Sequence, residues 1–238
     1  MLRIAVIAFW AVVAACVVPG GAEAAPRDAL KLSDEASYSA WAHPVTERVV
    51  RRAPTDTAAP LTRLRLFTED GPREVSLVLA SWRDPAGDGW FHIRVAGRPN
   101  GRTGWVRESA LGTIHTLRTV LVVDRRRLKA TLRRGGRKVW SSRIGVGRPS
   151  MPTPAGRFWI RERLRPRNPG GLYGPWAFGT SAYSTLSDWP GGGVVGIHGT
   201  NSPWLIPGRP SHGCVRVPNP AIRRLARILP IGTPVRVR

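Results

Sequence analysis

Cysteine, lysine and acidic residues are all scarce in this chain of 238 residues. It has two cysteines, and its 15 acidic residues face 37 basic ones, so that the formal net charge is +22 at pH 7. Almost all of the positive charge is arginine, because lysine occurs only at positions 31, 129 and 138. Such a charge favours a polyanionic partner, either nucleic acid or an anionic cell envelope. Alternatively, a bias toward arginine merely fills exposed positions, since the arginines are spread along the chain.

Long apolar runs are also missing, with one exception near the N-terminus. The run at residues 4–18 follows a basic start and precedes small residues at 22 and 24, which is the pattern of a secretory signal peptide. We place this signal peptide at residues 1–25. At about 1.5 Å per residue the run spans about 22 Å, less than the ~30 Å hydrocarbon core of a bilayer, which disfavours a permanent span. The sequence Val-Ala-Ala-Cys ending at Cys16 also resembles a lipobox, so lipidation is the alternative. Both alternatives predict export to the cell wall or periplasmic space.

The scarcity of cysteine draws attention to Cys214. If Cys16 is removed or lipidated, Cys214 is the only free thiol of the exported chain. Exported proteins normally use cysteines in pairs, and a lone thiol in an oxidising compartment is a liability unless it is buried or reactive. We therefore expect Cys214 to take part in chemistry, with an inert buried thiol as the alternative.

Residues 40–112 are expected to form a small β-barrel. Apolar and polar residues alternate at 61–67 and 90–95, a further strand is expected at 75–82, and turns rich in glycine separate these segments. Short strands joined by such turns favour a barrel. The stretch at 98–106, with the sequence RPNGRTGWV, resembles bacterial Src-homology-3-like wall domains. Such modules commonly bind peptide or glycan, and a packing and positioning role is the alternative.

Residues 117–238 form a second β-rich region, with a boundary at about 112–118. It contains one segment with helical periodicity, in which Asn219 is expected to cap the helix and Pro220 to occupy its first position. The apolar residues of this segment follow the spacing of one helix face, at positions 222, 225, 226 and 229. The predicted fold class is mainly β: a small barrel followed by a mixed β-sandwich with one C-terminal helix. Strands of the second region are expected at 120–123, 128–132, 139–146, 156–164, 176–183, 194–198 and 235–237.

Two motifs of the second region carry chemistry. His198 ends an expected strand, and residues 211–216 have the sequence Ser-His-Gly-Cys-Val-Arg. A thiol becomes a good nucleophile when a nearby imidazole accepts its proton, and His198 and His212 are the candidates to do this for Cys214. A zinc site formed by the same three side chains is the alternative, but no second cysteine or obvious carboxylate accompanies them.

Together these motifs resemble the catalytic signature of the L,D-transpeptidases of the YkuD type. His-Gly-Thr at 198–200, a short loop and the Ser-His-Gly-Cys motif occur in the order typical of that family. The resemblance extends over about 120 residues and implies a mixed β-sandwich enzyme that uses no metal or organic cofactor. The further similar segments are Gly-Val-Gly at 145–147, Thr-Pro-Ala-Gly-Arg-Phe at 153–158, Tyr-Gly-Pro-Trp at 173–176 and Gly-Thr-Pro-Val at 232–235.

The resemblance implies a role for each residue of the two motifs. Cys214 would be the nucleophile and His198 its base, while the backbone carbonyl of Gly199 would orient the imidazole ring. Donors near Gly213 and Cys214 would form the oxyanion hole, which stabilises the charge that develops on the attacked carbonyl. His212 would organise the site and its hydrogen bonds.

Four further residues would contact the substrate: Ser211, Arg216, Tyr173 and Trp176. Arg216 is suited to a bidentate contact with a carboxylate, although some relatives have asparagine at this place. Core packing is the alternative use of Trp176. The segment 165–174 is expected to be a mobile lid, with a packed rigid turn as the alternative.

The reaction that the resemblance implies is a two-step acyl transfer on peptidoglycan. Cys214 would attack the carbonyl after the diamino acid at the third position of a stem peptide, D-alanine would leave, and a thioester would remain. An amine from the third residue of a neighbouring stem would then resolve the thioester and form a cross-link. Resolution by water, which would make the enzyme an L,D-carboxypeptidase, is one alternative, and a non-catalytic cell-wall-binding protein is another. The expected partners are donor and acceptor stem peptides, with anionic cell-wall polymers also considered. Export disfavours nucleic acid, and membrane attachment is expected only through lipidation.

Overall fold

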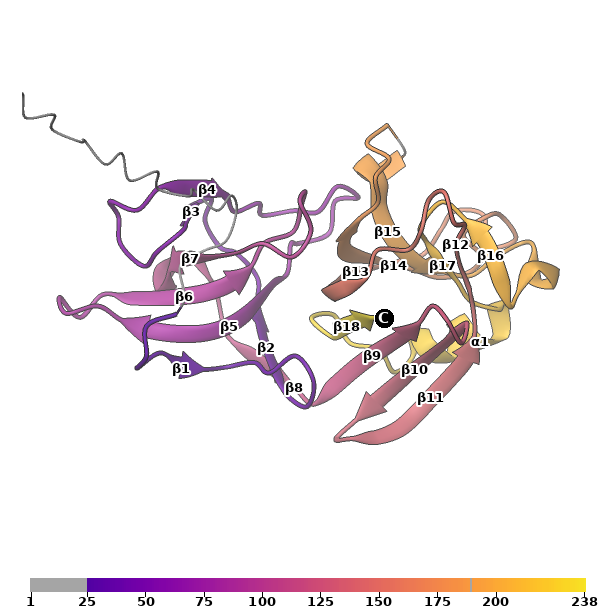
Figure 1. The fold of residues 1–238 in the computed structure, drawn as a ribbon, viewed down its shortest axis with the longest axis horizontal. Coiled ribbons are helices and arrows are strands. Elements are labelled where there is room, and N and C mark those ends of the chain that lie inside the picture. The colour runs from indigo at the N-terminus through magenta and orange to yellow at the C-terminus, as the bar shows by residue number, and fades with distance from the viewer. Residues whose placement is uncertain (1–24, 189) are drawn as a thin grey trace, which may run out of the picture.

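The computed structural model of the protein describes residues 25–188 and 190–238. The predicted signal peptide, apart from Ala25, and the predicted lipidation site at Cys16 lie outside these residues. The described chain forms two β-rich lobes, which follow one another along the sequence and lie side by side (Figure 1). Among the described residues, no helix is long and apolar enough to cross a membrane.

The N-terminal lobe is one antiparallel sheet. Its strands lie in the order β4-β3-β7-β6-β5-β2-β8, and β1 pairs with β5. β5 and β6 confirm two of the expected strands, whereas β4 ends at Arg63 because the chain then enters a turn closed by a bridge between Phe67 and Arg73. The Src-homology-3-like identity of this lobe stays a prediction. The strands are β1 Leu30–Lys31, β2 Ser39–Ala42, β3 Val49–Arg51, β4 Pro60–Arg63, β5 Ser76–Arg83, β6 Gly89–Arg94, β7 Thr103–Arg107 and β8 His115–Leu117.

The C-terminal lobe is a mixed sheet in the order β11-β10-β9-β18-β13-β14-β15-β17-β12-β16. Three pairs are parallel, β9 with β18, β15 with β17 and β12 with β16. Gly135 and Gly136 both have positive φ and join β10 to β11, as a two-residue hairpin turn requires. The strands are β9 Thr119–Asp124, β10 Lys129–Arg134, β11 Arg137–Arg143, β12 Gly145–Gly147, β13 Gly156–Leu164, β14 Ala177–Tyr183, β15 Val194–His198, β16 Gly208–Ser211, β17 Val215–Arg216 and β18 Pro234–Val237.

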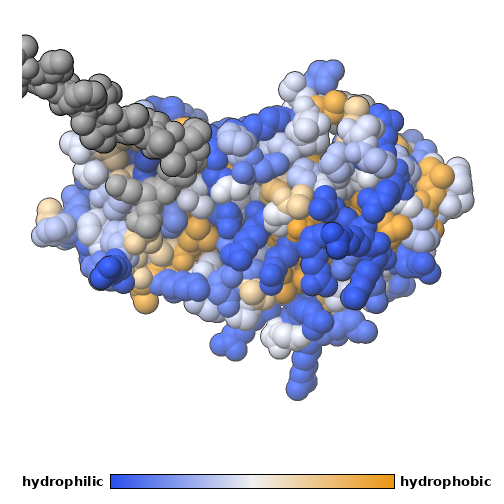
Figure 2. Space-filling model, viewed as in Figure 1, coloured by the Kyte–Doolittle hydropathy of each residue, from blue (hydrophilic) through white to orange (hydrophobic). Residues whose placement is uncertain are grey.

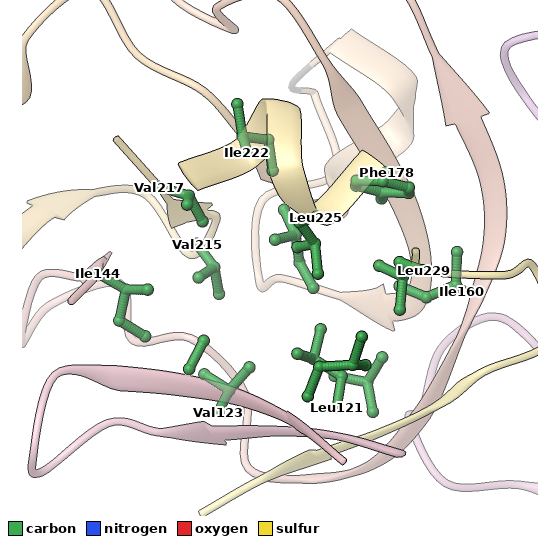
Figure 3. Packing of buried hydrophobic residues seen from close by; sticks show 14 of the residues in the cluster. Leu121, Val123, Ile144, Ile160, Phe178, Val215, Val217, Ile222, Leu225 and Leu229 are labelled. Carbon is green, nitrogen blue, oxygen red and sulfur yellow. The ribbon is translucent and has the colours of Figure 1, made fainter. Parts of the chain in front are cut away.

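One α-helix, α1 (Asn219–Ala226), packs its apolar face against this sheet. In Figure 3, Ile222 and Leu225 of the helix lie above Leu121 and Val123 of β9, with Phe178 and Ile160 beside them. Every apolar position predicted for the helix face is buried. The two sheets and this short helix near the C-terminus confirm the predicted fold class, which is mainly β with one C-terminal helix.

The predicted cap of this helix is wrong by one residue. The helix begins at Asn219 itself, Pro218 precedes it, and Pro220 is the second helical residue. The Asn219 side chain is used elsewhere, because its Oδ1 accepts a hydrogen bond from the backbone N–H of Thr200 at 2.9 Å. The helix start is thereby tied to the segment that follows His198.

Aromatic side chains join the two lobes. Trp159 of β13 is buried among Trp41, Val75 and Leu77 of the N-terminal sheet, and its Nε1 donates to the carbonyl of Val75 at 2.7 Å. Trp41 packs against Gly232 of the C-terminal lobe so closely that a Cβ there would lie 2.3 Å from the indole ring. The lobes therefore share a continuous buried boundary.

A buried ion pair crosses the same boundary. Arg161 of β13 has a fully buried side chain and donates from Nε to Glu74 Oε1 at 2.7 Å and from Nη2 to Glu74 Oε2. Its Nη2 also lies 3.0 Å from Glu69 Oε2, and its Nη1 donates to the Tyr183 hydroxyl at 3.2 Å. Both glutamates belong to the N-terminal lobe, so its position against the C-terminal sheet is fixed by charge as well as by packing.

Candidate active site

The sheet topology brings the two chemical motifs together. β15 and β17 are parallel neighbours, with Ile197 opposite Val215 and His198 opposite Arg216. Cys214 immediately precedes β17, and His198 is the last residue of β15. This register puts Cys214 beside Gly196, two residues before His198 on the neighbouring strand, so two motifs that are far apart in the sequence lie close together in the sheet.

Gly196 lies between the thiol and the imidazole. Its backbone N–H donates to Cys214 Sγ at 3.4 Å. A Cβ at this glycine would lie 3.9 Å from the same sulfur and 3.6 Å from His198 Cδ2, the ring carbon bonded to Nε2. Both reactive groups thus border one small space, which stays open because residue 196 has no side chain. The sequence did not identify Gly196 as a site residue.

The backbone around Cys214 is held in place by two hydroxyl groups. Ser211 Oγ donates to the Cys214 carbonyl at 2.6 Å and accepts from the Gly213 N–H at 3.2 Å. Gly213 has φ of 124°, a conformation that favours glycine, and its carbonyl accepts from Thr153 Oγ1 at 2.7 Å. Ser211 thus supports the nucleophile from behind. Thr153, which the sequence analysis did not single out as a site residue, does the same.

His198 is buried and oriented by its neighbour. Its Nδ1 lies 2.6 Å from the Gly199 carbonyl, which can only accept, so Nδ1 carries the hydrogen and Nε2 of the neutral ring holds a lone pair. The Tyr173 ring meets the imidazole edge-on, with centroids 5.0 Å apart. A Cβ at Gly199 would lie 2.4 Å from Asn219 Oδ1, so this position requires glycine for the close packing behind the ring.

Burial keeps both reactive groups neutral. It lowers the pKa of His198 to about 4, against the hydrogen bond to Gly199, and the positive charge of Arg216 lowers it further. Burial also raises the pKa of the Cys214 thiol, although the Gly196 N–H and Arg216 act in the opposite direction. At neutral pH the resting site therefore holds a thiol beside an imidazole that is ready to accept a proton.

This protonation state predicts the pH dependence of alkylation. Without substrate, the rate constant for Cys214 and iodoacetamide should be low at pH 7 and rise about tenfold per pH unit, until pH passes the raised pKa of the thiol. Intact-mass time courses between pH 5 and pH 10 measure this profile. A rate that stays high and constant down to pH 5 would show a resting thiolate–imidazolium pair and contradict the neutral state.

Two pockets meet at the thiol. The larger is a cleft of about 540 Å³, bordered by Gly179 and Gly196 of the sheet and by Arg165 and Arg167 of the 165–174 segment. The smaller pocket, of about 30 Å³, is bordered by Ser184, Ser211, His212 and Arg216. Both pockets share Tyr173, Val194, His198 and Cys214.

The structure places the predicted substrate residues differently. Tyr173 borders both pockets, and Ser211 and Arg216 border the smaller one, where Arg216 Nε is buried without a hydrogen-bond partner in the described structure. Trp176 borders neither pocket; its ring lies 4.4 Å from the Arg165 guanidinium and 5.6 Å from that of Arg163. Its backbone carbonyl instead accepts from the Gly199 N–H at 3.1 Å, so Trp176 contributes to the site through its backbone.

Segment 165–174 forms one wall of the cleft and is built of turns. Asn168 Oδ1 accepts from the Gly170 N–H at 3.0 Å, and the Gly171 carbonyl accepts from the Gly174 N–H at 3.0 Å. Its predicted movement as a lid stays a prediction. In the described residues no group of three or more histidine, cysteine, aspartate or glutamate side chains could hold a metal ion.

Comparison with known proteins matches the C-terminal lobe to one family. The sequence profile of the L,D-transpeptidase catalytic domain, YkuD, matches residues 118–237, which include both motifs. YkuD of Bacillus subtilis (strain 168) is 38% identical over 94 residues, covering 40% of this chain and 50% of that protein. YkuD of Bacillus licheniformis is 37% identical with the same coverage, so the chain spans about half the length of the curated relatives it matches.

Solved structures with similarity to the chain include proteins of two further bacteria. A Bdellovibrio bacteriovorus protein is 31% identical with a TM-score of 0.40 and covers 51% of this chain and 47% of its own. An L,D-transpeptidase of Enterococcus faecium is 25% identical with a TM-score of 0.38 and covers 50% of this chain and 49% of its own.

Proposed function

Since the chain belongs to the L,D-transpeptidase (YkuD) family, we propose that it cross-links peptidoglycan by joining the third residues of two stem peptides through a thioester on Cys214. The observation that supports this proposal is the position of the Cys214 thiol. It lies beside a neutral, oriented imidazole at the point where two pockets meet. Acyl transfer needs such an arrangement, because an acyl donor and an acceptor must reach one sulfur in turn.

In the first step, the Cys214 sulfur attacks the carbonyl that follows the third stem residue. His198 Nε2 takes the thiol proton as the carbon–sulfur bond forms, and it later returns the proton to the departing amino group of D-alanine. The Gly213 N–H already donates to Ser211 Oγ, so we assign the Cys214 N–H as the donor to the developing oxyanion. The carbon–nitrogen bond breaks and a thioester remains.

Arg216 gives this reaction a direction. Arg216 borders the smaller pocket, its Nε is buried without a hydrogen-bond partner among the described residues, and a guanidinium favours a carboxylate. The donor ends in the carboxylate of D-alanine, one residue beyond the attacked carbonyl. The leaving residue therefore belongs on the Arg216 side of Cys214, where the smaller pocket of about 30 Å³ has to widen to admit it, and the rest of the donor lies in the larger cleft.

In the second step, an amine takes the place of D-alanine. The side-chain amine of the third residue of another stem loses a proton to His198 and attacks the thioester carbonyl, which restores the thiol and forms the new amide bond. If water attacks instead, the same intermediate yields a shortened stem and the enzyme is an L,D-carboxypeptidase.

The proposed setting is the outside of the cell membrane. Peptidoglycan lies there, and the first 25 residues have the pattern of a signal peptide. Hydrophilic side chains cover much of the face seen in Figure 2, and exposed basic residues are frequent on β10, β11 and α1. Such a surface suits anionic cell-wall polymers as additional partners. Each exposed charge adds little to the binding free energy, but many charges of one sign together favour association with a polyanion.

Product analysis tests the proposed function. The protein is incubated with a disaccharide-tetrapeptide, and products are separated and identified by mass spectrometry. We expect release of D-alanine and a dimer linked between third residues, and no dimer when the side-chain amine of the stem is acetylated. Tripeptide without dimer would favour the carboxypeptidase, and an unchanged tetrapeptide would overturn acyl transfer altogether.

A further inference from the structure

A carboxyl group lies in the same cross-strand row as the thiol. Glu162 of β13 is opposite Gly179 of β14, and Gly179 is opposite Gly196 of β15. Gly196 in turn contacts Cys214: its N–H donates to the sulfur, and a Cβ at residue 196 would lie 3.9 Å from that sulfur. The row Glu162, Gly179, Gly196, Cys214 therefore crosses the sheet on one face, with two glycines in the middle.

The two glycines form the floor of the larger cleft. A Cβ at Gly179 would lie 2.1 Å from Glu162 Oε1, so the carboxyl group of Glu162 reaches over this glycine. Adjacent strands lie about 5 Å apart, which puts the carboxyl group roughly 5–10 Å from the sulfur. An extended side chain of a substrate could cross this distance along the glycine floor.

The N-terminal lobe closes this end of the cleft. The turn at 67–73 presents Asp70 as a lining residue of the cleft, although Asp70 belongs to the other sheet. The two residues that precede Asp70 anchor the turn: Thr68 Oγ1 donates to Glu162 Oε2, and Glu69 pairs with Arg161 at 3.0 Å. Its position over the cleft is therefore fixed by buried contacts with the catalytic sheet.

Two carboxyl groups at this end of the cleft have oxygen atoms without a hydrogen-bond or ion-pair partner among the described residues. Among the described residues, no hydrogen bond or ion pair engages the exposed Asp70 carboxylate, and Glu162 Oε1 is buried without a partner. Burial raises the pKa of Glu162 to about 7, and the negative charge of Asp70 adds to the rise. In a chain of net charge +22, Asp70 is the acidic residue among those that border the cleft, and Arg165 and Arg167 are the basic ones.

We infer that Asp70 of the N-terminal lobe binds the side-chain ammonium of the third stem residue of the acyl donor, with Glu162 and Thr68 positioning the turn that carries it. The inference rests on the proposed function. Arg216 assigns the leaving D-alanine to the smaller pocket, so the diamino acid that precedes the attacked carbonyl extends into the larger cleft. Its side chain ends in a cation, and Asp70 is the exposed anion that borders that cleft. The N-terminal lobe would then select the donor rather than serve only as a support.

The test measures acylation of Cys214 by the donor alone. Two tetrapeptide donors are compared, one with a free side-chain amine and one acetylated there, and thioester formation is followed by intact mass. Asp70→Asn should slow acylation by the free-amine donor about tenfold, the loss expected for one charge-assisted contact. It should leave the rate with the acetylated donor unchanged within about twofold, because that donor has no cation to lose.

Glu47→Gln is the matched control, since it removes one exposed carboxylate of the same lobe that does not border the cleft. It should change neither rate, and the melting temperatures of both variants should equal that of the unsubstituted protein. If Asp70→Asn slows both donors equally or slows neither, the inference is wrong while the proposed function stands. If the unsubstituted protein forms no thioester with either donor, the proposed function fails and the inference fails with it.

Discussion

Cys214→Ala is expected to abolish thioester formation, and His198→Gln is expected to slow it by about a hundredfold to ten-thousandfold. Alanine removes the only atom of residue 214 that can form the acyl bond. Glutamine keeps a similar volume, but its amide cannot accept the thiol proton. Burial keeps the Cys214 thiol protonated, so the thiol must lose its proton before it can attack. Without a proton acceptor, acylation therefore becomes slower.

A matched control separates this effect from the loss of any buried histidine. His92 lies in the N-terminal sheet, where its ring stacks on Trp105 with centroids 4.7 Å apart and burial lowers its pKa to about 4. His92→Gln should leave the acylation rate within about twofold, although it lies in a similarly desolvated place. The rates are measured by intact mass under single-turnover conditions. A thioester that still forms on Cys214→Ala, or equal effects of the two histidine substitutions, would contradict the proposed mechanism.

The candidate reactive groups could be named from the sequence because they stand in short local motifs. A lone thiol in a chain that is expected to be exported, within a Ser-His-Gly-Cys motif, predicts a nucleophile without knowledge of the fold. The strand that ends at His198 was also predicted from its apolar pattern, and the structure places this strand beside the one that follows Cys214. The hydrogen bond between His198 and the Gly199 carbonyl follows from adjacency in sequence.

Features that depend on register between distant strands could not be predicted. Nothing local to Glu162, Gly179 or Gly196 reveals that they share a row, because pairing partners are fixed by the whole sheet. Asp70 reaches the cleft only because the two lobes dock through buried contacts. Asn219 was expected to cap a helix, but in the folded chain its side-chain oxygen accepts a hydrogen bond from the Thr200 N–H instead.

Docking of the lobes leads to the largest effect that we expect on stability. Glu74→Gln removes the main counter-charge of Arg161, whose side chain is fully buried in β13. Burial by itself acts to lower the pKa of Arg161, but the hydrogen bonds and charge of Glu74 outweigh it and raise that pKa. The guanidinium stays charged in the variant as well, because arginine is intrinsically so basic that it does not lose its proton in proteins. Removing one partner of a buried pair costs about 3–5 kcal/mol, because the other charge loses its compensation. Glu69 still contacts Arg161 at 3.0 Å, which puts the expected loss at about 3 kcal/mol, the lower end of this range.

For a chain of this size, that loss should lower the melting temperature by about 10 °C. The control is Arg65→Gln, which breaks the pair of Arg65 with Glu69 at 2.9 Å; with Arg65 47% exposed, the expected loss is below about 1 kcal/mol. Calorimetry of both variants measures the difference. Replacing both partners, Glu74→Met with Arg161→Met, should restore most of the stability, because no buried charge is then left unpaired.

The same measurement tells whether the two lobes unfold together. Glu74 and Arg161 lie in different lobes, so loss of their pair weakens the boundary rather than either sheet. If the boundary holds the chain in one cooperative unit, Glu74→Gln should move a single transition to lower temperature. Two separate transitions in the variant would mean that each lobe is stable alone. In that case acylation by the free-amine donor should fall as it does in Asp70→Asn, because the turn at 67–73 would no longer be held over the cleft. A Glu74→Gln variant that keeps its melting temperature within about 2 °C would show that water reaches Arg161 and that the pair does not join the lobes.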